Sequence, residues 1–96
     1  MMAMELPHSA LTVFHALTRK GPLTPTQICR NTNLPDRTVS FALRKLVKQG
    51  LIQRIPNLLD MRSALYHPIL SKAMELISKY GPESIIGSQL TFILRR

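Results

Sequence analysis

The sequence predicts a small, mainly α-helical domain that carries one β-hairpin. Its 96 residues, of which 45% are apolar, are enough for one domain with a small core. Prolines and glycines stand at regular intervals, where they favour the starts and the ends of helices. Only after Gly50 does helical spacing give way to the alternation that is typical of a strand.

The first two helices are predicted over residues 7–20 and 25–31, after an N-terminal end that is expected to be frayed. Thr24 is a suitable N-cap for the second helix. In that helix, Ile28 and Cys29 are expected to face inward. The inner face of the first helix consists of apolar residues at helical spacing: Ala10, Val13, Phe14 and Leu17.

The central helix is predicted from Pro35 or Asp36 to Gln49. Asn33 before it tolerates the left-handed conformation of a tight turn, and Gly50 is placed to end the helix. Its buried stripe is predicted to be Val39, Leu43, Leu46 and Val47. Its outer surface is then Arg37, Ser40, Phe41, Arg44, Lys45 and Lys48. A short helix that is basic in front suits the major groove of DNA, although a core helix with a solvated basic face has the same pattern.

The second half of the chain is predicted to form a hairpin and two helices. Strands over residues 51–55 and 63–67 flank a tip at residues 58–62. Pro68 is expected to open a helix that continues to Tyr80. A last helix is expected to begin at Pro82 and to span residues 82–93.

The last helix is apolar around much of its circumference, so it is expected to need more than one neighbour. Gly87 inside it costs about 1 kcal/mol relative to alanine, which the close approach of another helix would justify. A second subunit is the expected partner, with Ile86, Leu90 and Ile93 as the dimerisation contacts. The alternative is that this helix packs on the first helix of its own chain.

The charge of the chain is concentrated in one segment. The formal net charge is +8, and residues 19–62 hold nine lysines and arginines against two aspartates, an excess of +7. Clustering of this kind indicates a polyanionic partner such as nucleic acid.

Other kinds of chemistry have no support in the sequence. The three histidines and Cys29 lack metal-ligand spacing, the five acidic residues are not grouped, and no glycine-rich phosphate loop is present. We therefore expect neither an enzyme nor a metal or cofactor. Cys29 is expected to pack rather than to sense redox state. A single cysteine and the lack of a long apolar run fit a cytoplasmic protein without a membrane span.

The order helix, extended link, helix, turn, helix, hairpin is that of a winged helix-turn-helix. The run LTPTQICRNTNLPDRTVSFALRKLVKQGLIQRIPNLLDMRSALYHP resembles the MarR-like winged helix family of transcriptional regulators. Within it, TVSFALRKLVKQGLI matches the family's pattern of Thr-Val, paired apolar spacing and Gly-Leu-Ile. Asp60-Met61-Arg62 matches its Asp-x-Arg wing motif. The resemblance covers about residues 11–67 of a single domain, with a DNA-binding core at residues 8–67 and C-terminal helices at 68–96.

The resemblance implies a homodimer that binds double-stranded DNA, with the central helix in the major groove and the hairpin in the minor groove. Arg62 matches the wing arginine that enters the minor groove, and Asp60 matches the carboxylate that holds it. The alternative for this pair is an exposed turn without a function. The predicted DNA-binding residues are Thr24, Thr26, Arg37, Thr38, Ser40, Phe41, Arg44, Lys45, Arg54, Asp60 and Arg62.

The chain departs from the family in two respects. It is shorter than typical members, so the pocket in which the family binds a small-molecule effector is expected to be reduced or absent. Phe41 stands where the family often has a polar residue, and it could contact either a thymine methyl group or another protein. We therefore expect a sequence-specific transcriptional regulator. The alternative is a winged helix protein-interaction module, which Phe41 and the apolar wing residues Leu58, Leu59 and Met61 favour.

Overall fold

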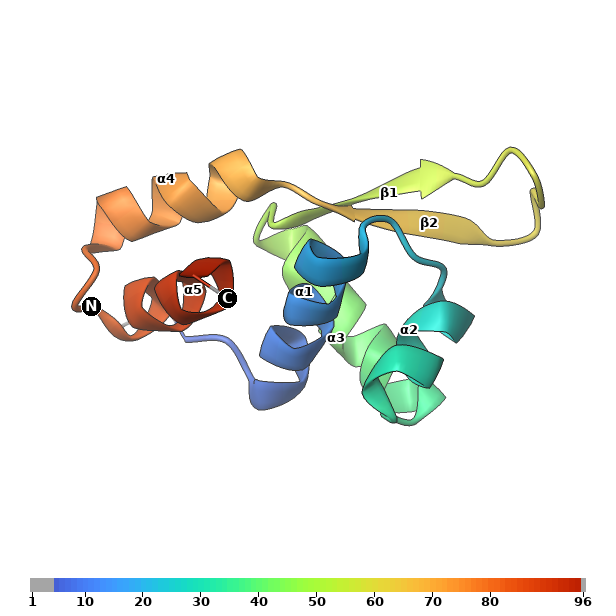
Figure 1. Cartoon of the computed structure of the whole chain (residues 1–96), viewed down its shortest axis with the longest axis horizontal. Coiled ribbons are helices and arrows are strands. Elements are labelled where there is room, and N and C mark those ends of the chain that lie inside the picture. Colours follow the sequence, from blue (N-terminus) through green and yellow to red (C-terminus); the bar gives the residue numbers. More distant parts are fainter. Residues whose placement is uncertain (1–4, 96) are drawn as a thin grey trace.

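Helices and one hairpin follow one another along the chain in the predicted order. The computed structural model describes residues 5–95. Within this range the elements are α1 (His8–Lys20), α2 (Pro25–Thr32), α3 (Asp36–Lys48), β1 (Ile52–Pro56), β2 (Ala64–Pro68), α4 (Leu70–Tyr80) and α5 (Ile85–Arg95). Figure 1 shows α1, α2 and α3 together below the hairpin, which extends beyond them at one end, while α4 and α5 form the other end. The helix-turn-helix and the hairpin thus share one half of the molecule.

The core lies where α1 packs against α3. The four inner residues predicted for α1 are all buried: Ala10, Val13, Phe14 and Leu17. On α3, Val39, Leu43 and Leu46 are buried as predicted. The prediction for Val47 is wrong, because this side chain is 44% exposed and Ala42 is buried instead. The buried stripe follows the helical period, and Val47 lies beyond its edge on the side of the hairpin.

The turn between α2 and α3 has the geometry that its sequence predicts. Asn33 has a φ of 60° and ends α2 in the left-handed conformation. At the start of α2, Thr24 and Gln27 form a capping box in which each side chain binds the other residue's backbone N–H. Ile28 is buried, whereas Cys29 is only half-buried, so the prediction of an inward side chain holds fully for Ile28 alone.

The hairpin is fastened to the helices at its base. β1 and β2 are antiparallel, with Arg54 opposite Tyr66. The backbones of Leu23 and Tyr66 exchange hydrogen bonds of 2.8 and 3.2 Å, which attach the link before α2 to β2. The predicted alternation holds only at the base of β1, where Ile52 is buried. Further out the strand is mostly exposed, because the hairpin extends past the helices that would cover it (Figure 1).

Two helix starts differ from the prediction. Pro68 does not open α4 but ends β2, paired with Ile52. The next N–H, that of Ile69, donates to the carbonyl of Leu51 over 2.8 Å, so the helix begins only after it. Residues 82–84 form a turn rather than the first turn of α5. The hydroxyl of Ser84 accepts a 3.0 Å hydrogen bond from the N–H of Gly87, which makes Ser84 the cap of a helix that starts at residue 85.

Gly87 is required by a close approach within its own chain. A methyl group at this position would overlap the carbonyl oxygen of Gly81 in the turn between α4 and α5. The close approach that the glycine predicted is therefore real, but its partner is this turn. The glycine is thus explained within one chain and carries no separate argument for a second subunit.

The residues predicted as dimerisation contacts are also part of the single-chain core. Ile86, Leu90 and Ile93 are at most 4% exposed within one chain. They belong to the same core cluster as the inner residues of α1, and α5 packs on both α4 and α1 of its own chain. The exposed apolar residues of α5 are instead Ile85 and Phe92.

The segment before α1 is held against α5. Leu6 is buried, and its backbone N–H and carbonyl each form a 3.1 Å hydrogen bond with the side-chain amide of Gln89. The expectation of a frayed end is therefore wrong at Leu6, while its first four residues lie outside the described range. Of the helices in residues 5–95, none has the length and apolar character that crossing a membrane requires.

Candidate nucleic-acid interface

The outer side of α3 carries a line of exposed side chains directly opposite its buried stripe. Residues spaced by three or four positions lie above one another on a helix. This spacing aligns Arg37, Phe41, Arg44 and Lys48, and all four are exposed. We call these four residues the α3 ridge. Three of the four are cationic, so the ridge presents positive charge along the length of the helix.

Phe41 interrupts this cationic line and positions a neighbouring cation. The ammonium group of Lys45 lies 5.7 Å from the centre of the Phe41 ring, within the range of a cation–π contact. Phe41 itself is 39% exposed, so part of the ring faces outward beside the charges. Lys45 and Ser40 are exposed on the two sides of the ridge, as predicted, and Thr38 is half-buried.

The start of α3 is joined to α2 by a contact across the turn. The thiol of Cys29 donates a 3.0 Å hydrogen bond to a carboxylate oxygen of Asp36. This hydrogen bond, together with burial and the negative charge of Asp36, raises the pKa of the Cys29 thiol. A thiol with a raised pKa forms less thiolate and reacts less readily. The geometry thus agrees with a packing role for Cys29.

The two predicted contact residues at the start of α2, Thr24 and Thr26, differ in whether the side chain already forms a hydrogen bond. The hydroxyl of Thr24 accepts from the N–H of Gln27, so it is engaged in the cap. Thr26, in the first turn, is exposed. Both residues lie where α2 begins, next to the inner face of the hairpin, because Pro25 and the hairpin residue Tyr66 line one groove.

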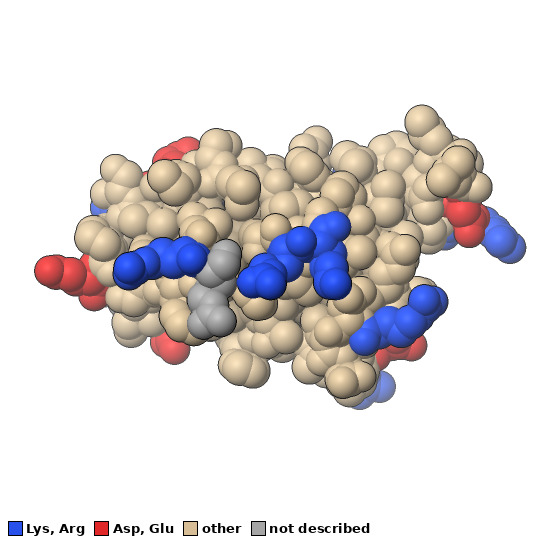
Figure 2. Space-filling view, viewed as in Figure 1, with Lys and Arg blue, Asp and Glu red and all other residues tan. Residues whose placement is uncertain are grey.

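The tip of the hairpin is an ordered double turn. The side chain of Asn57 accepts a 3.1 Å hydrogen bond from the N–H of Leu59, and the side chain of Asp60 accepts one of the same length from the N–H of Arg62. The same oxygen of Asp60 also accepts from Nε of Arg62 over 3.1 Å. In Figure 2 an acidic and a basic side chain lie side by side at the hairpin end of the molecule.

This ion pair orients Arg62 rather than stabilising the fold. The Arg62 side chain is 92% exposed, and exposed ion pairs contribute only about 0–1 kcal/mol. Asp60 engages Nε, and no contact within residues 5–95 occupies the terminal nitrogens of the guanidinium. The Asp-x-Arg pattern therefore has the physical arrangement that the sequence comparison implied, with the carboxylate holding the arginine.

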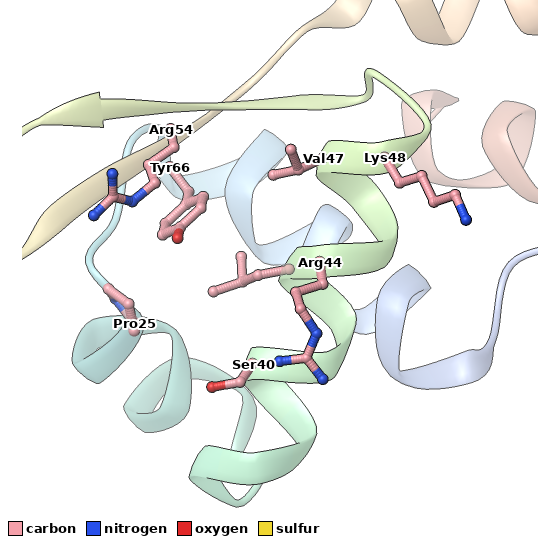
Figure 3. Close-up of a pocket in the computed structure, with 8 residues that line it drawn as sticks. Pro25, Ser40, Arg44, Val47, Lys48, Arg54 and Tyr66 are labelled. Carbon is pink, nitrogen blue, oxygen red and sulfur yellow. The ribbon is translucent and has the colours of Figure 1, made fainter.

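A groove separates the α3 ridge from the hairpin. Its volume is about 580 Å³, and it is lined by Pro25, Ser40, Leu43, Arg44, Val47, Lys48, Arg54 and Tyr66. Figure 3 shows that these side chains come from α2, α3 and both strands, with the ring of Tyr66 directed into the space between them. Three cations and no acidic side chain line the groove, so it extends the positive surface of α3 toward the wing.

Tyr66 and Pro25 were not predicted as site residues. Tyr66 lies on the same face of the hairpin as Arg54, because the two are directly opposite in the strand register. Correct pairing of the two predicted strands would have indicated this neighbour of Arg54. The hydrogen bonds that set the pairing, including those between Tyr66 and Leu23, join residues far apart in sequence and leave no local pattern.

The face of the molecule shown in Figure 2 differs from the α3 ridge in how its basic side chains are distributed. Basic side chains stand there in separate groups over α1, α2 and α5. Among residues 5–95, no group of three or more His, Cys, Asp or Glu is arranged to hold a metal ion.

Comparison with protein families decides what kind of domain this is. A sequence model described as the MarR family matches residues 5–63, which is more than half of the chain and includes the whole helix-turn-helix and the Asp-x-Arg motif. The chain belongs to the MarR family. The resemblance that was inferred from residues 38–52 and 60–62 is thereby confirmed.

Solved structures give the same fold. A probable transcriptional regulator from Pseudomonas aeruginosa is similar with a TM-score of 0.70 and 24% identity over 94% of this chain and 62% of its own. A mutant of MarR from E. coli complexed with operator DNA has a TM-score of 0.68 and 18% identity, over 93% and 56% of the two chains. The PcaV transcriptional regulator from Streptomyces coelicolor has values of 0.70 and 15%, over 95% and 62%.

These matches confirm the winged helix-turn-helix fold of MarR-family regulators. No curated protein matches the chain in sequence. The chain spans only about three fifths of the length of the solved relatives. Its fold is that of a DNA-binding transcription regulator.

Proposed function

We propose that this MarR-family chain is a sequence-specific transcriptional regulator that binds duplex DNA as a homodimer. α3 lies in the major groove and the hairpin reaches the adjacent minor groove. The observation that carries this proposal is the exposed α3 ridge beside a wing whose Arg62 is already oriented by Asp60. A major groove about 12 Å wide admits one helix, and its base edges distinguish all four base pairs.

The wing suits the minor groove by charge and shape. A narrow minor groove has an enhanced negative potential that attracts an inserted guanidinium. Arg62 is the outermost cation of the hairpin tip and is nearly fully exposed. The structural relative from E. coli was solved with operator DNA, which supports duplex DNA as the partner.

The proposed dimer contact lies on the surface between α1 and α5. A second groove, of about 510 Å³, is lined there by His8, Leu11, Thr12, His15, Ser88, Gln89, Phe92 and Ile93. We call it the α1–α5 surface. Phe92 lines this largely apolar groove and is 66% exposed. The groove therefore provides accessible apolar surface for a dimer contact, which the buried core residues of α5 do not provide.

A protein-interaction module is the second candidate function. Leu58, Leu59 and Met61 surround Arg62 at the wing tip and are all highly exposed, up to 98% for Leu59. An apolar tip of this kind fits a protein partner as well as the sugar edges of a minor groove. Selection of specific duplexes by the free protein distinguishes the two functions.

Selection from a library of randomised duplexes tests the proposal. We expect the protein to enrich a pseudo-palindrome whose half-sites are about 10–10.5 base pairs apart, because a two-fold dimer places its two α3 helices about one turn of DNA apart. Phe92→Glu should select single half-sites and sediment as a monomer, because an unpaired charge is unfavourable at an apolar contact.

Met74→Glu is the matched control, since Met74 is 60% exposed on α4, outside the α1–α5 surface. This variant should keep the paired half-sites and the mass of a dimer. Enrichment of no sequence by the wild type would contradict sequence-specific recognition. Paired half-sites selected by Phe92→Glu would contradict the proposed contact.

A further inference from the structure

The groove between the α3 ridge and the hairpin has no role in the contacts proposed so far for the α3 ridge and the wing tip. It stands between the helix proposed for the major groove and the wing proposed for the minor groove. Between these two grooves of a duplex runs a phosphate backbone. Arg54 on β1 and Lys48 on α3 line the groove from different elements, and no carboxylate lines it (Figure 3).

Tyr66 is a neutral hydrogen-bond donor whose position in this groove is fixed by the fold. Its backbone is locked to Leu23 by two hydrogen bonds of 2.8 and 3.2 Å, and its side chain packs against the core. Its ring points into the space bounded by α2, α3 and the hairpin (Figure 3). Within residues 5–95, the hydroxyl has no hydrogen-bond partner, and it is not sealed from solvent.

We propose that this groove seats one phosphodiester strand of the duplex, with the Tyr66 hydroxyl donating to a phosphate oxygen that Arg54 neutralises. Tyr66 and Arg54 are direct cross-strand neighbours, so one phosphate lies within reach of both side chains. This assignment rests on the proposed function, since it specifies which part of the bound duplex contacts the groove. A phosphate contact fixes the register of the protein on DNA and reads no bases.

The neutral and the cationic member of this pair have different expected signatures. Tyr66→Phe should weaken binding alike on all duplexes, by about tenfold for one hydrogen bond to a charged acceptor. The dependence of affinity on salt should stay as in the wild type, because a hydroxyl displaces no counterion. Arg54→Gln should also weaken binding alike on all duplexes, and it should reduce the slope of log K against log salt by about 0.9.

Duplexes with single methylphosphonate linkages locate the seated phosphate. At that position the uncharged linkage should weaken the wild type but weaken Tyr66→Phe and Arg54→Gln much less, because two changes that remove one interaction are not additive. At other positions the losses should add. Tyr80→Phe, which removes a tyrosine hydroxyl from α4, is the matched control and should bind as the wild type does.

Each outcome decides the assignment. Wild-type affinity of Tyr66→Phe, or losses that add at every linkage, would overturn the phosphate seat while leaving the proposed function intact. If the wild type itself fails to bind unmodified duplex, both fail together. Millimolar inorganic phosphate at constant ionic strength should not displace DNA from the protein. If a low concentration of phosphate displaces the DNA, the groove is a site for a free anion instead. The thermal unfolding midpoint of Tyr66→Phe, measured alongside, should match the wild type because the ring and the backbone bridge are retained.

Discussion

Arg44→Ala is expected to weaken binding to the selected duplex by about 1–3 kcal/mol and to relax selectivity at one base pair. Arg44 stands in the middle of the α3 ridge, exposed and two turns beyond Arg37. A guanidinium in this place can pair with both acceptors on the major-groove edge of guanine. Competition binding against a panel of duplexes, each changed at one base pair, measures both effects.

Lys48→Ala is the matched control at the end of the same ridge. An ammonium at the last turn of α3 is expected to contact phosphate only, so its loss should lower affinity alike on all sequences. Identical specificity profiles for Arg44→Ala and Lys48→Ala would contradict the assignment of Arg44 to base readout.

Gly87→Ala is expected to lower the free energy of unfolding by about 1–3 kcal/mol. Alanine is the better helix former by about 1 kcal/mol, but its methyl group would overlap the carbonyl of Gly81. The overlapping atom is backbone, and the same Gly81 carbonyl accepts hydrogen bonds from the N–H and the hydroxyl of Ser84, which hold the turn in place. The loss in the free energy of unfolding is then the steric cost of the overlap minus the gain in helix propensity. Urea denaturation measures this difference.

Thr91→Ala is the control for this substitution, because it lies on the same helix and none of the described contacts uses its side-chain hydroxyl. A change of no more than about 0.5 kcal/mol is expected there. Equal stability of Gly87→Ala and the wild type would show that the turn between α4 and α5 relaxes, and that close backbone approach does not explain this glycine.

The sequence was sufficient to predict elements whose signals are local. Asn33 and Gly50 mark the ends of α2 and α3, and both have the positive φ that was expected at such positions. The cap of α5 was missed because Pro82 gave a stronger local signal than Ser84, whose role depends on a hydrogen bond to Gly87. Local signals therefore place helices well but leave their first turn uncertain by a few residues.

Contacts between distant segments were harder to predict. Apolar periodicity predicted a contact role for Ile86, Leu90 and Ile93 without identifying the surface that buries them. They lie in the core of their own chain, where α5 packs on α4 and α1. The glycine at position 87 correctly indicated a close approach, but the sequence did not indicate which segment approaches it. Tyr66 was missed for the same reason, since its place beside Arg54 follows from strand register and not from any motif.

The central claim is that α3 and the hairpin bind duplex DNA, and the affinity for a labelled duplex at several salt concentrations tests it most directly. The α3 ridge, Arg54 and Arg62 supply exposed cations. If three of them neutralise phosphates, log K should fall with log salt with a slope of roughly −3 per chain. Strong binding at low salt with a slope of this size is the predicted result. No detectable binding at low salt, or an affinity that does not change with salt, would contradict the claim and favour a protein partner for the wing.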